Sequence, residues 1–185
     1  MDSLNIFGSF FGVKKLNQDL KKIKKTCLSL QKNNQSIIKS NKGGHQYHFD
    51  KNVLSSLTNQ IEKEANIFVK NLNLIKDVYI QNIWLNVNKH KDMNMPHIHP
   101  KSICSGVFYV EVFENSGDLV FENPNDLQLF LEDSVKEHNI YNSCIWRLKP
   151  LNNNLVLFPS WMKHYVDMNL SNKDRISISF NLNFI

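Results

Sequence analysis

The chain has 185 residues, of which 42% are hydrophobic and 21% charged; these shares are ordinary for a soluble globular protein, and the length suits one domain with a buried core. Its three cysteines are odd in number, widely spaced and without a CxxC pair, which argues against a disulfide framework and fits a reducing cytoplasm. No apolar run approaches the ~18 residues that a membrane span needs, and no secretion signal is evident, so we expect a cytoplasmic protein without a membrane partner.

The net charge of +5 owes much to lysines near the N-terminus. Such a run is able to contact nucleic acid or an acidic partner. However, no aromatic residues are interleaved with these lysines, as they would be on a surface that binds single strands. We therefore interpret the run as a solvated helix face and do not expect nucleic acid as a partner. The lysines are Lys14, Lys15, Lys21, Lys22, Lys24 and Lys25.

Two helices are predicted in the first 76 residues. Residues 6–13 are a candidate first edge strand, and apolar residues then recur at helical spacing over residues 17–31, with lysines on the other side. Residues 33–44 are polar and contain two adjacent glycines, which indicates a loop. The second helix, over residues 52–72, has the clearer pattern, in which these residues repeat at spacings of three and four: Leu54, Leu57, Ile61, Ala65 and Phe68.

From residue 78 onward the apolar period changes from helical to alternating. We find no repeat and no linker, so residues 1–185 are expected to form a single domain, with 1–76 as mainly helical support and 77–185 as the core. Two helices followed by about seven strands predict an α+β, mainly β domain, in which the helices cover one face of an antiparallel sheet system. The predicted strands are 78–88, 103–113, 118–122, 144–149, 154–158, 164–168 and 175–184.

The last predicted strand, 175–184, separates apolar and polar residues most plainly. Its apolar face is expected to pack against the helices, and its polar face is expected to line a cavity. A polar row that points inward is costly unless it serves a wet site or a ligand. The apolar face comprises Ile176, Ile178, Phe180, Leu182 and Phe184, and the polar face comprises Arg175, Ser177, Ser179, Asn181 and Asn183.

Three histidines form a candidate metal site. His97 and His99 are spaced i and i+2, so on an extended strand they project to the same side. His164 follows a predicted buried strand and a tight corner at residues 159–160. Imidazole is the commonest nitrogen ligand for iron, zinc and copper, and three such ligands on one side of a metal leave the other side open. The remaining histidines are interpreted as structural or surface residues: His45, His48, His90 and His138.

Arg175 is a candidate anion-binding residue beside this site. Its guanidinium is a permanent cation that grips a carboxylate with two parallel hydrogen bonds. Ser177 lies two residues on and points the same way, so its hydroxyl is able to bind the same carboxylate. The alternative is a surface ion pair of Arg175 with Asp174 or Glu111, which the inward parity of Arg175 disfavours.

The blocks HIHPKSICSGVFYV, SGDLVFENP and LVLFPSWMKHYV…RISISFN carry a resemblance to a known superfamily. The chain resembles the Fe(II)/2-oxoglutarate-dependent oxygenases, and within them a family of small 2OG-Fe(II) oxygenases of bacteria and phages. The resemblance covers about residues 78–185 and implies a double-stranded β-helix (jelly-roll, cupin-like) fold. It also implies that a phage-encoded member would act in the host cytoplasm.

The resemblance further implies the cofactors and their ligands. Fe(II) would be held by His97, His99 and His164, and the distal carboxylate of the cosubstrate 2-oxoglutarate by Arg175 and Ser177. Further contacts to the cosubstrate are expected from Asn86 and Tyr109, although parity leaves Tyr109 and Phe108 open as alternatives. The implied partners are 2-oxoglutarate, O2 and an unidentified substrate. The implied reaction releases succinate and CO2, with hydroxylation as the default outcome.

His99 departs from the usual superfamily motif, which is HxD or HxE. Three neutral ligands would leave the full charge of Fe(II) in place and strengthen its attraction for the dianionic cosubstrate. Two alternatives remain open at this stage: His99 does not ligate the metal, or a carboxylate comes from Glu111 or Asp167. Residues 122–143 interrupt the strand pattern and are expected to be either a substrate lid or a segment packed outside the barrel.

Two other functions are alternatives to the oxygenase for a β-barrel with these histidines. A cupin-type metalloprotein also has HxH and a later histidine, but Ile103 and Cys104 stand where a cupin has its glutamate, and the Arg175 strand has no role there. A non-catalytic barrel would bind nucleic acid or protein through its basic first helix. The sequence names no substrate and leaves a homodimer open. The tryptophans are expected in the core or the cavity wall: Trp84, Trp146 and Trp161.

Overall fold

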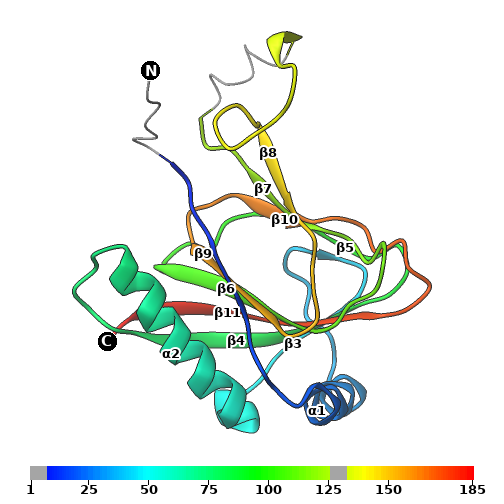
Figure 1. The fold of residues 1–185 in the computed structure, drawn as a ribbon. Coiled ribbons are helices and arrows are strands. Elements are labelled where there is room, and N and C mark those ends of the chain that lie inside the picture. Colours follow the sequence, from blue (N-terminus) through cyan, green and yellow to red (C-terminus); the bar gives the residue numbers. More distant parts are fainter. Residues whose placement is uncertain (1–7, 126–132) are drawn as a thin grey trace.

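The computed structural model describes residues 8–125 and 133–185, and Figure 1 shows two β-sheets that face each other with two helices outside them. The α+β, mainly β architecture expected from the sequence is therefore confirmed. The strands are β1 (Gly12–Lys15), β2 (Asn41–Lys42), β3 (His45–His48), β4 (Val78–Asn88), β5 (Met93–His97), β6 (Cys104–Glu111), β7 (Leu119–Glu122), β8 (Ile145–Leu148), β9 (Asn154–Pro159), β10 (His164–Val166) and β11 (Arg175–Phe184).

Both sheets are antiparallel. One has six strands in the order β1-β9-β6-β11-β4-β3, and the other has five in the order β2-β5-β10-β7-β8. Consecutive strands of the chain often lie in different sheets, so β4 is in the first sheet, β5 in the second and β6 again in the first. Two sheets that share their connections in this way enclose a common interior, on which the inner side chains of both converge.

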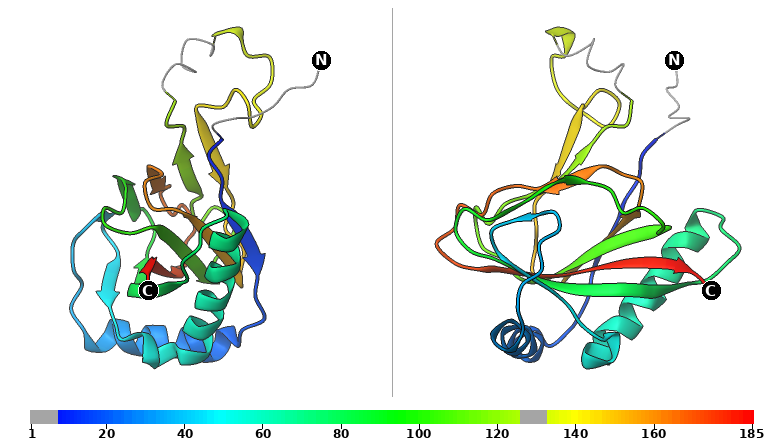
Figure 2. Two further views of the ribbon diagram at one scale, coloured as in Figure 1. Left: turned by 90° about the vertical axis from the view of Figure 1, so that its left-hand side faces the viewer. Right: turned by 180° about the vertical axis from the view of Figure 1, so that it is seen from behind.

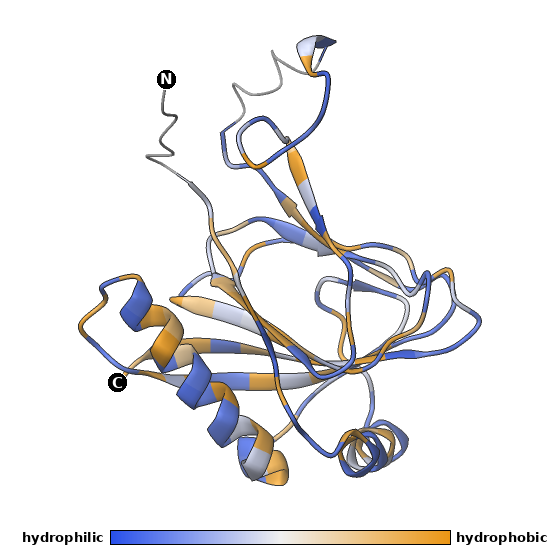
Figure 3. Ribbon diagram, viewed as in Figure 1, coloured by the Kyte–Doolittle hydropathy of each residue, from blue (hydrophilic) through white to orange (hydrophobic). Residues whose placement is uncertain are grey.

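The helices α1 (Leu20–Asn33) and α2 (Ser55–Asn71) lie against the outer face of the six-stranded sheet (Figure 2). A 3-10 turn, η1 (Lys51–Leu54), leads directly into α2. Helix α1 begins where the Asp19 side chain accepts a hydrogen bond of 3.1 Å from the backbone N–H of Lys22. Each helix has an apolar and a polar side (Figure 3), and the sheet covers residues of the apolar side, including Ile23, Cys27, Leu57, Ile61, Ala65 and Val69.

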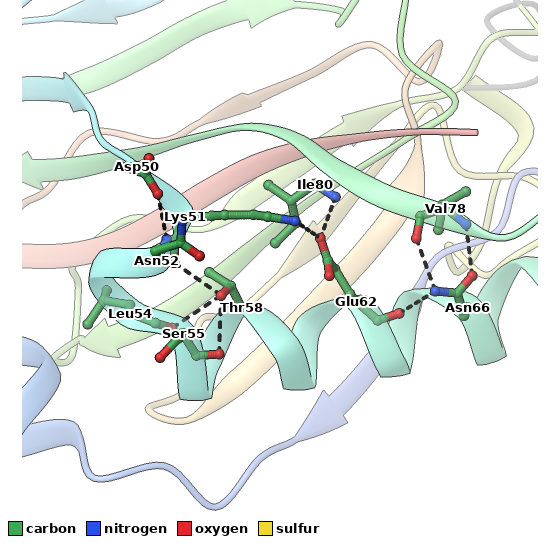
Figure 4. A network of polar contacts seen from close by, with 10 residues as sticks. All are labelled: Asp50, Lys51, Asn52, Leu54, Ser55, Thr58, Glu62, Asn66, Val78 and Ile80. Carbon is green, nitrogen blue, oxygen red and sulfur yellow. Dashed lines mark hydrogen bonds and ion pairs between the residues drawn. The ribbon is translucent and has the colours of Figure 1, made fainter. Parts of the chain in front are cut away.

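A network of polar side chains joins α2 to β4 (Figure 4). Glu62 accepts hydrogen bonds from the backbone N–H of Ile80 at 2.9 Å and from the ammonium of Lys51 at 2.8 Å. Asn66 donates to the carbonyl of Val78 at 3.0 Å and accepts from its N–H at 2.8 Å. Two helix side chains thus complete the hydrogen bonding of a strand where it has no neighbour for these groups. The network positions α2 along β4.

Strand β11 separates the helix-facing core from the interior between the sheets. Its residues Ile176, Ile178, Phe180 and Leu182 are all buried in the core cluster that includes both helices. The polar side of β11 faces the interior between the sheets, as the alternation of apolar and polar residues in the sequence predicted. Gly106 lies beside Phe180 in the register of β6 and β11, and a Cβ at Gly106 would come within 2.5 Å of Phe180 Cζ and of the Val156 carbonyl oxygen. Only glycine fits there without displacing a strand.

Three strands were not predicted from the sequence. β2 and β3 lie partly within the segment predicted to be a loop, and β5 lies just before the HIH pair. β2 and β3 are too short to show a period of two, and β5 contains Pro96, which normally argues against a strand. Pairing with other strands determines all three, because β3 bonds to β4, and β2 and β10 both bond to β5.

Two of the three tryptophans are not in the core or a cavity wall. Trp146 in β8 is 37% exposed and Trp161 is 53% exposed, whereas Trp84 in β4 is buried. β7 and β8 form a hairpin that extends away from the body of the molecule (Figure 2), which leaves Trp146 on the surface. Part of the candidate edge strand at 6–13 and the apolar run of the candidate lid lie outside the described residues. Within the described part of the chain, no helix has the length and apolar character to cross a membrane.

Candidate metal centre

A cavity of about 790 Å³ lies between the two sheets, on the polar side of β11. All seven predicted site residues line it: His97, His99, His164, Arg175, Ser177, Asn86 and Tyr109. The described residues of the candidate lid, 122–125 and 133–143, contribute nothing to its walls. The cavity is of the size that buries a small-molecule ligand, since such pockets measure about 300–1,000 Å³.

The three histidines converge on one point of this cavity. His97 is the last residue of β5 and His164 is the first of β10, and the two are direct partners in the register of these strands. One ligand atom from each of His97, His99 and His164 lies within 4.8 Å of the others. The rings of His97 and His164 are closest, with centroids 4.4 Å apart. The fold thus brings together histidines that lie 67 positions apart in the chain.

His99 reaches the cluster by a route that differs from the prediction. Strand β5 ends at His97, so His99 does not share a strand face with it. The chain instead leaves the sheet, and the backbone N–H of His99 donates a hydrogen bond of 3.0 Å to the carbonyl of Ser160. Ser160 stands at the corner between β9 and β10, so the same corner positions both His99 and His164.

Backbone carbonyl groups orient two of the imidazole rings. Nδ1 of His97 lies 2.7 Å from the carbonyl oxygen of Met95, and Nδ1 of His164 lies 2.8 Å from that of Met162. A carbonyl oxygen only accepts, so each Nδ1 carries the proton and donates it. Nε2 of each ring is then the nitrogen with the free lone pair. This is the arrangement in which a histidine is prepared to ligate a metal.

Burial keeps the three imidazoles neutral. Loss of water around the rings, with a smaller effect of the neighbouring histidines, lowers the pKa of His164 to about 3 and that of His99 to about 4. The pKa of His97 is also lowered, mainly by burial. A neutral imidazole is the form that binds a metal, so at pH 7 no proton competes for these nitrogens.

The donor set fits iron, because three imidazole nitrogens suit Fe(II) as well as zinc or copper. No carboxylate joins the cluster among the described residues. Of the two alternatives considered, Glu111 pairs with Lys24 at 2.7 Å, and Asp167 pairs with Arg147. Both carboxylates thus have cationic partners elsewhere, which leaves His99 as the third nitrogen of the group.

Arg175 is the largest fully buried side chain of the described residues, at 2% exposure. It donates hydrogen bonds to the carbonyls of Ser116 at 2.8 Å and Gly117 at 3.3 Å. It forms no ion pair within the described part of the chain, neither with Asp174 nor with Glu111. Burial lowers the pKa of Arg175, and the carboxylates of Asp167 and Asp92 counteract this only from beyond ion-pair distance. A buried cation without a directly paired anion is costly, so this geometry favours binding of an anion from outside the chain.

Gly117 makes room for the guanidinium of Arg175. Its backbone has φ of +90°, a region that side chains with a Cβ rarely adopt. A Cβ at this position would lie 2.2 Å from the carbonyl oxygen of Asp167 and 2.9 Å from Nη1 of Arg175. The SGD block of the sequence therefore contributes a tight turn whose carbonyl groups orient the arginine.

Strand register places three more predicted residues in one row beside Arg175. Ser177 pairs with Asn86 of β4 on one side and with Tyr109 of β6 on the other. Tyr109 lines the cavity, while Phe108 packs in the core toward the helices, which resolves the alternative that parity left open. Burial raises the pKa of the Tyr109 hydroxyl, although the nearby Arg175 lowers it, so this group stays a proton donor.

The structure also brings residues to the cavity that the sequence analysis did not assign. Gln46 and His48 of β3, Lys39 before β2, and Asn82 of β4 all contribute to its lining, although His48 was interpreted as a structural or surface residue. The first three lie in the segment whose strands were not predicted. Recognising β3 would have exposed the signal, because Gln46 and His48 are spaced i and i+2 and so share the inner face.

The chain was compared with known families and proteins. The model of a family described as "Putative 2OG-Fe(II) oxygenase" matches residues 82–181. This is the oxygenase family of the earlier resemblance and not the cupin alternative. A search of curated proteins gives no significant match.

Solved structures of similar fold share little sequence with this chain. A prolyl-4-hydroxylase from Pseudomonas putida has a TM-score of 0.69 at 12% identity, over 96% of this chain and 94% of that one. The α-ketoglutarate-dependent epimerase SnoN from nogalamycin biosynthesis has a TM-score of 0.72 at 10% identity, over 95% and 79%. A viral collagen prolyl hydroxylase from Paramecium Bursaria Chlorella virus-1, in its 2OG complex, has 0.64 at 11%, over 96% and 98%. The likeness confirms the double-stranded β-helix fold.

Proposed function

The chain belongs to the 2OG-Fe(II) oxygenase family, and we propose that it hydroxylates a small substrate with release of succinate and CO2. Two of the three structures of similar fold are named as prolyl hydroxylases and one as an epimerase, so the reactions performed on this fold differ. Hydroxylation is the simplest outcome for this cofactor pair, because it needs no reacting group beyond a C–H bond of the substrate.

Arg175 is the observation that carries this proposal. It is a cation at 2% exposure, it lines the cavity that holds the histidine cluster, and it has no ion-pair partner among the described residues. A free carboxylate in the cavity would compensate its charge with two parallel hydrogen bonds. The distal carboxylate of 2-oxoglutarate is such a group, and the other end of the same molecule would reach the metal.

We assign Fe(II) to His97, His99 and His164. When bound, the iron supplies the activation of O2 and the oxidative decarboxylation of 2-oxoglutarate. The chain would hold the metal through Nε2 of His97 and His164, because their Nδ1 atoms donate to backbone carbonyls. Three neutral ligands leave the charge of Fe(II) uncompensated, which strengthens its attraction for a dianionic cosubstrate.

The remaining assigned residues bind and orient the cosubstrate. Tyr109 stays protonated because burial raises its pKa, so its hydroxyl donates a hydrogen bond to a carboxylate beside Arg175. Ser177 offers a second hydroxyl in the same row of the sheet. The side-chain amide of Asn86 donates a hydrogen bond of 3.0 Å to the hydroxyl of Ser179, which fixes the amide at the cavity wall. Apolar residues such as Phe158 and Leu119 line the same cavity and limit the access of water.

The proposal is tested by an anaerobic titration of metal-free protein, first with Fe(II) and then with 2-oxoglutarate. We expect the visible charge-transfer band that arises when both are bound together. Arg175→Lys keeps the charge but loses the two-pronged geometry, so the dissociation constant of 2-oxoglutarate should rise about tenfold or more. Arg175→Ala should abolish the band. Ser56→Ala, which replaces an exposed serine of α2, is the control and should leave the band unchanged.

Circular dichroism must show that the Arg175 variants remain folded, because Arg175 also bonds to two backbone carbonyls. An unchanged band in folded Arg175→Ala, or oxygen consumption still coupled to succinate release, would show that the cosubstrate assignment is wrong. Tight iron binding without a band would mean a metalloprotein that does not use 2-oxoglutarate. Absence of metal binding would overturn the assignment of the three histidines.

A further inference from the structure

The lining of the cavity extends along β11 from Arg175 to Asn181. The inward residues Arg175, Ser177, Ser179 and Asn181 succeed one another along β11, and each step of two residues advances about 6.6 Å. The proposed cosubstrate would occupy the beginning of this row. Ser179 and Asn181 lie beyond it, and their register partners on β4 are Trp84 and Asn82. We call the part of the cavity that these residues and His48 of β3 line the second compartment. Gln46 of β3 is the register partner of Asn86 and lies at the border between this compartment and the cosubstrate end.

The cavity contains no acidic side chain. Its described lining includes two residues with permanent positive charge, Arg175 and Lys39, and not one aspartate or glutamate. A dianionic cosubstrate would balance the charge of Fe(II), since the three imidazoles contribute none. Arg175 would be paired with the distal carboxylate. The ammonium of Lys39 then remains as a cation at the second compartment, with no ion pair to any described residue.

The position of Lys39 follows from the segment that crosses between the two sheets. The backbone N–H of Ile37 donates to the carbonyl of Gln46 in β3 at 2.8 Å, which attaches the segment to the six-stranded sheet. The carbonyl of Ser40 accepts from the N–H of Met95 in β5 at 2.7 Å, which attaches it to the other sheet. Lys39 lies between these two attachments. Its charge is close enough to His48 to lower the pKa of that imidazole.

Two amide side chains, one in this compartment and one at its border, each have an oxygen without a hydrogen-bond partner. The side-chain oxygens Oε1 of Gln46 and Oδ1 of Asn82 are buried and accept no hydrogen bond from any described residue. Gln46 itself is only 4% exposed, and both residues line the cavity. Buried polar atoms are rarely left unsatisfied, so each of these requires a donor from a bound molecule or an ordered water. A ligand with N–H or O–H groups would satisfy them.

An aromatic wall completes the compartment. The ring of Trp84 lies between those of His48 and His99, with centroid distances of 5.4 Å and 5.7 Å. Because His99 belongs to the proposed metal centre, a molecule that packs against Trp84 is brought close to the metal. The wall would thus hold part of a bound molecule close to the metal. Lys39, an exposed residue, lies at the rim of the same compartment.

We propose that this compartment binds the substrate, and that the substrate is a small anion with hydrogen-bond donors. Its carboxylate or phosphate pairs with Lys39, its donors satisfy Gln46 and Asn82, and its reacting portion packs against Trp84. This inference rests on the proposed function, because it assumes that 2-oxoglutarate occupies the Arg175 end. It argues against a cationic substrate, since no carboxylate stands among the described residues that line the cavity.

The test uses protein loaded with Fe(II) and 2-oxoglutarate without oxygen, and it compares probes that differ only in charge. Hippurate is paired with its neutral amide, and uridine monophosphate with uridine, so that the two pairs distinguish a carboxylate from a phosphate. Calorimetry should give at least one anion a dissociation constant about fivefold lower than that of its neutral partner. The preference should disappear in Lys39→Gln and persist in Lys42→Gln, an exposed lysine on the same segment.

A second variant tests the amide contacts. Asn82→Ala should weaken both members of the preferred pair by a similar factor, because it removes a hydrogen-bonding group without changing the charge. Equal binding of anions and neutral partners in wild-type protein would overturn the inference, as would an anion preference that survives Lys39→Gln. The charge-transfer band is recorded on the same wild-type sample. If the band is present and the preference absent, only this inference fails; if the band itself is absent, the proposed function fails.

Discussion

The histidine cluster shows how burial by itself prepares single residues for metal binding. In water an imidazole is half protonated near pH 6.5, but the rings of His99 and His164 have lost so much water that their pKa values fall to about 4 and about 3. The carbonyl groups of Met95 and Met162 fix which nitrogen of His97 and His164 carries the proton. Protonation state and tautomer are therefore determined before any metal arrives.

This burial has a consequence for the pH dependence of stability. The unfolded chain protonates its histidines below about pH 6.5, whereas folded His99 and His164 resist protonation until about pH 4 and about pH 3. The unfolded state therefore binds more protons in this window, and the unfolding free energy of the metal-free protein should fall as pH falls from 6.5. Each of the two imidazoles contributes up to about 1.4 kcal/mol per pH unit.

Urea denaturation of metal-free protein between pH 7.5 and pH 5 measures this slope, in a range where carboxylates contribute little. His164→Asn should make the slope shallower. His138→Asn, which replaces an exposed histidine, is the control and should leave the slope unchanged. A slope that is the same in His164→Asn and wild-type protein would contradict the assignment of a lowered pKa to His164.

At the scale of elements, the polar network between α2 and β4 holds a helix to the sheet. Asn66 satisfies both backbone groups of Val78, and Glu62 satisfies the N–H of Ile80 (Figure 4). Beyond Ile80, the register of β4 and β11 shifts between Asn181 and Leu182, which marks a β-bulge. The network therefore supports β4 at the position where its pairing with β11 is irregular.

Removal of one member of this network should be costly. Asn66→Ala leaves the N–H and the carbonyl of Val78 without their partners, so we expect the unfolding free energy to fall by about 2 kcal/mol and the melting temperature by about 4–8 °C. Asn59→Ala is the matched control, because Asn59 is an exposed asparagine of the same helix. Thermal unfolding followed by circular dichroism compares the two. Equal melting temperatures would show that solvent replaces the Asn66 contacts.

Long strands, in which the alternation repeats many times, were predictable from the sequence, and short strands were not. The bounds of β4 and β11 match the predicted strands 78–88 and 175–184, because alternation over many residues leaves one interpretation. β2 and β3 have too few residues to alternate visibly, and their partners lie elsewhere in the chain. Residues 33–44 were therefore predicted to be a loop and residues 45–48 were not assigned, although both line one side of the cavity.

At the scale of the whole molecule, the first 76 residues do more than support the barrel. They supply β1 and β3 to one sheet and β2 to the other, and their helices cover the apolar side of β11. A fragment of residues 77–185 would expose the core residues Ile178 and Phe180 to water. It would also lose three strands from the edges of the sheets. This arrangement favours the interpretation of residues 1–185 as one domain, which stays a prediction.

We therefore predict that a fragment of residues 77–185 does not fold by itself. Without the helices, its exposed apolar surface should produce aggregation or a fluctuating compact state. Calorimetry should show no cooperative unfolding, and NMR spectra should lack dispersed amide signals, whereas the full chain should show both. A cooperative transition in the fragment would mean that residues 77–185 form an independent domain.

The sequence by itself determined the periodic elements, the polar face of β11 and the candidate ligands His97, His99, His164 and Arg175. These follow from local patterns, because alternation and residue chemistry are properties of short segments. Only the tertiary structure decided that Tyr109 and not Phe108 faces the cavity, that a corner at Ser160 positions His99, and that Lys39 and Gln46 border a second compartment. These depend on strand register and on contacts between distant segments, for which a local pattern carries no information.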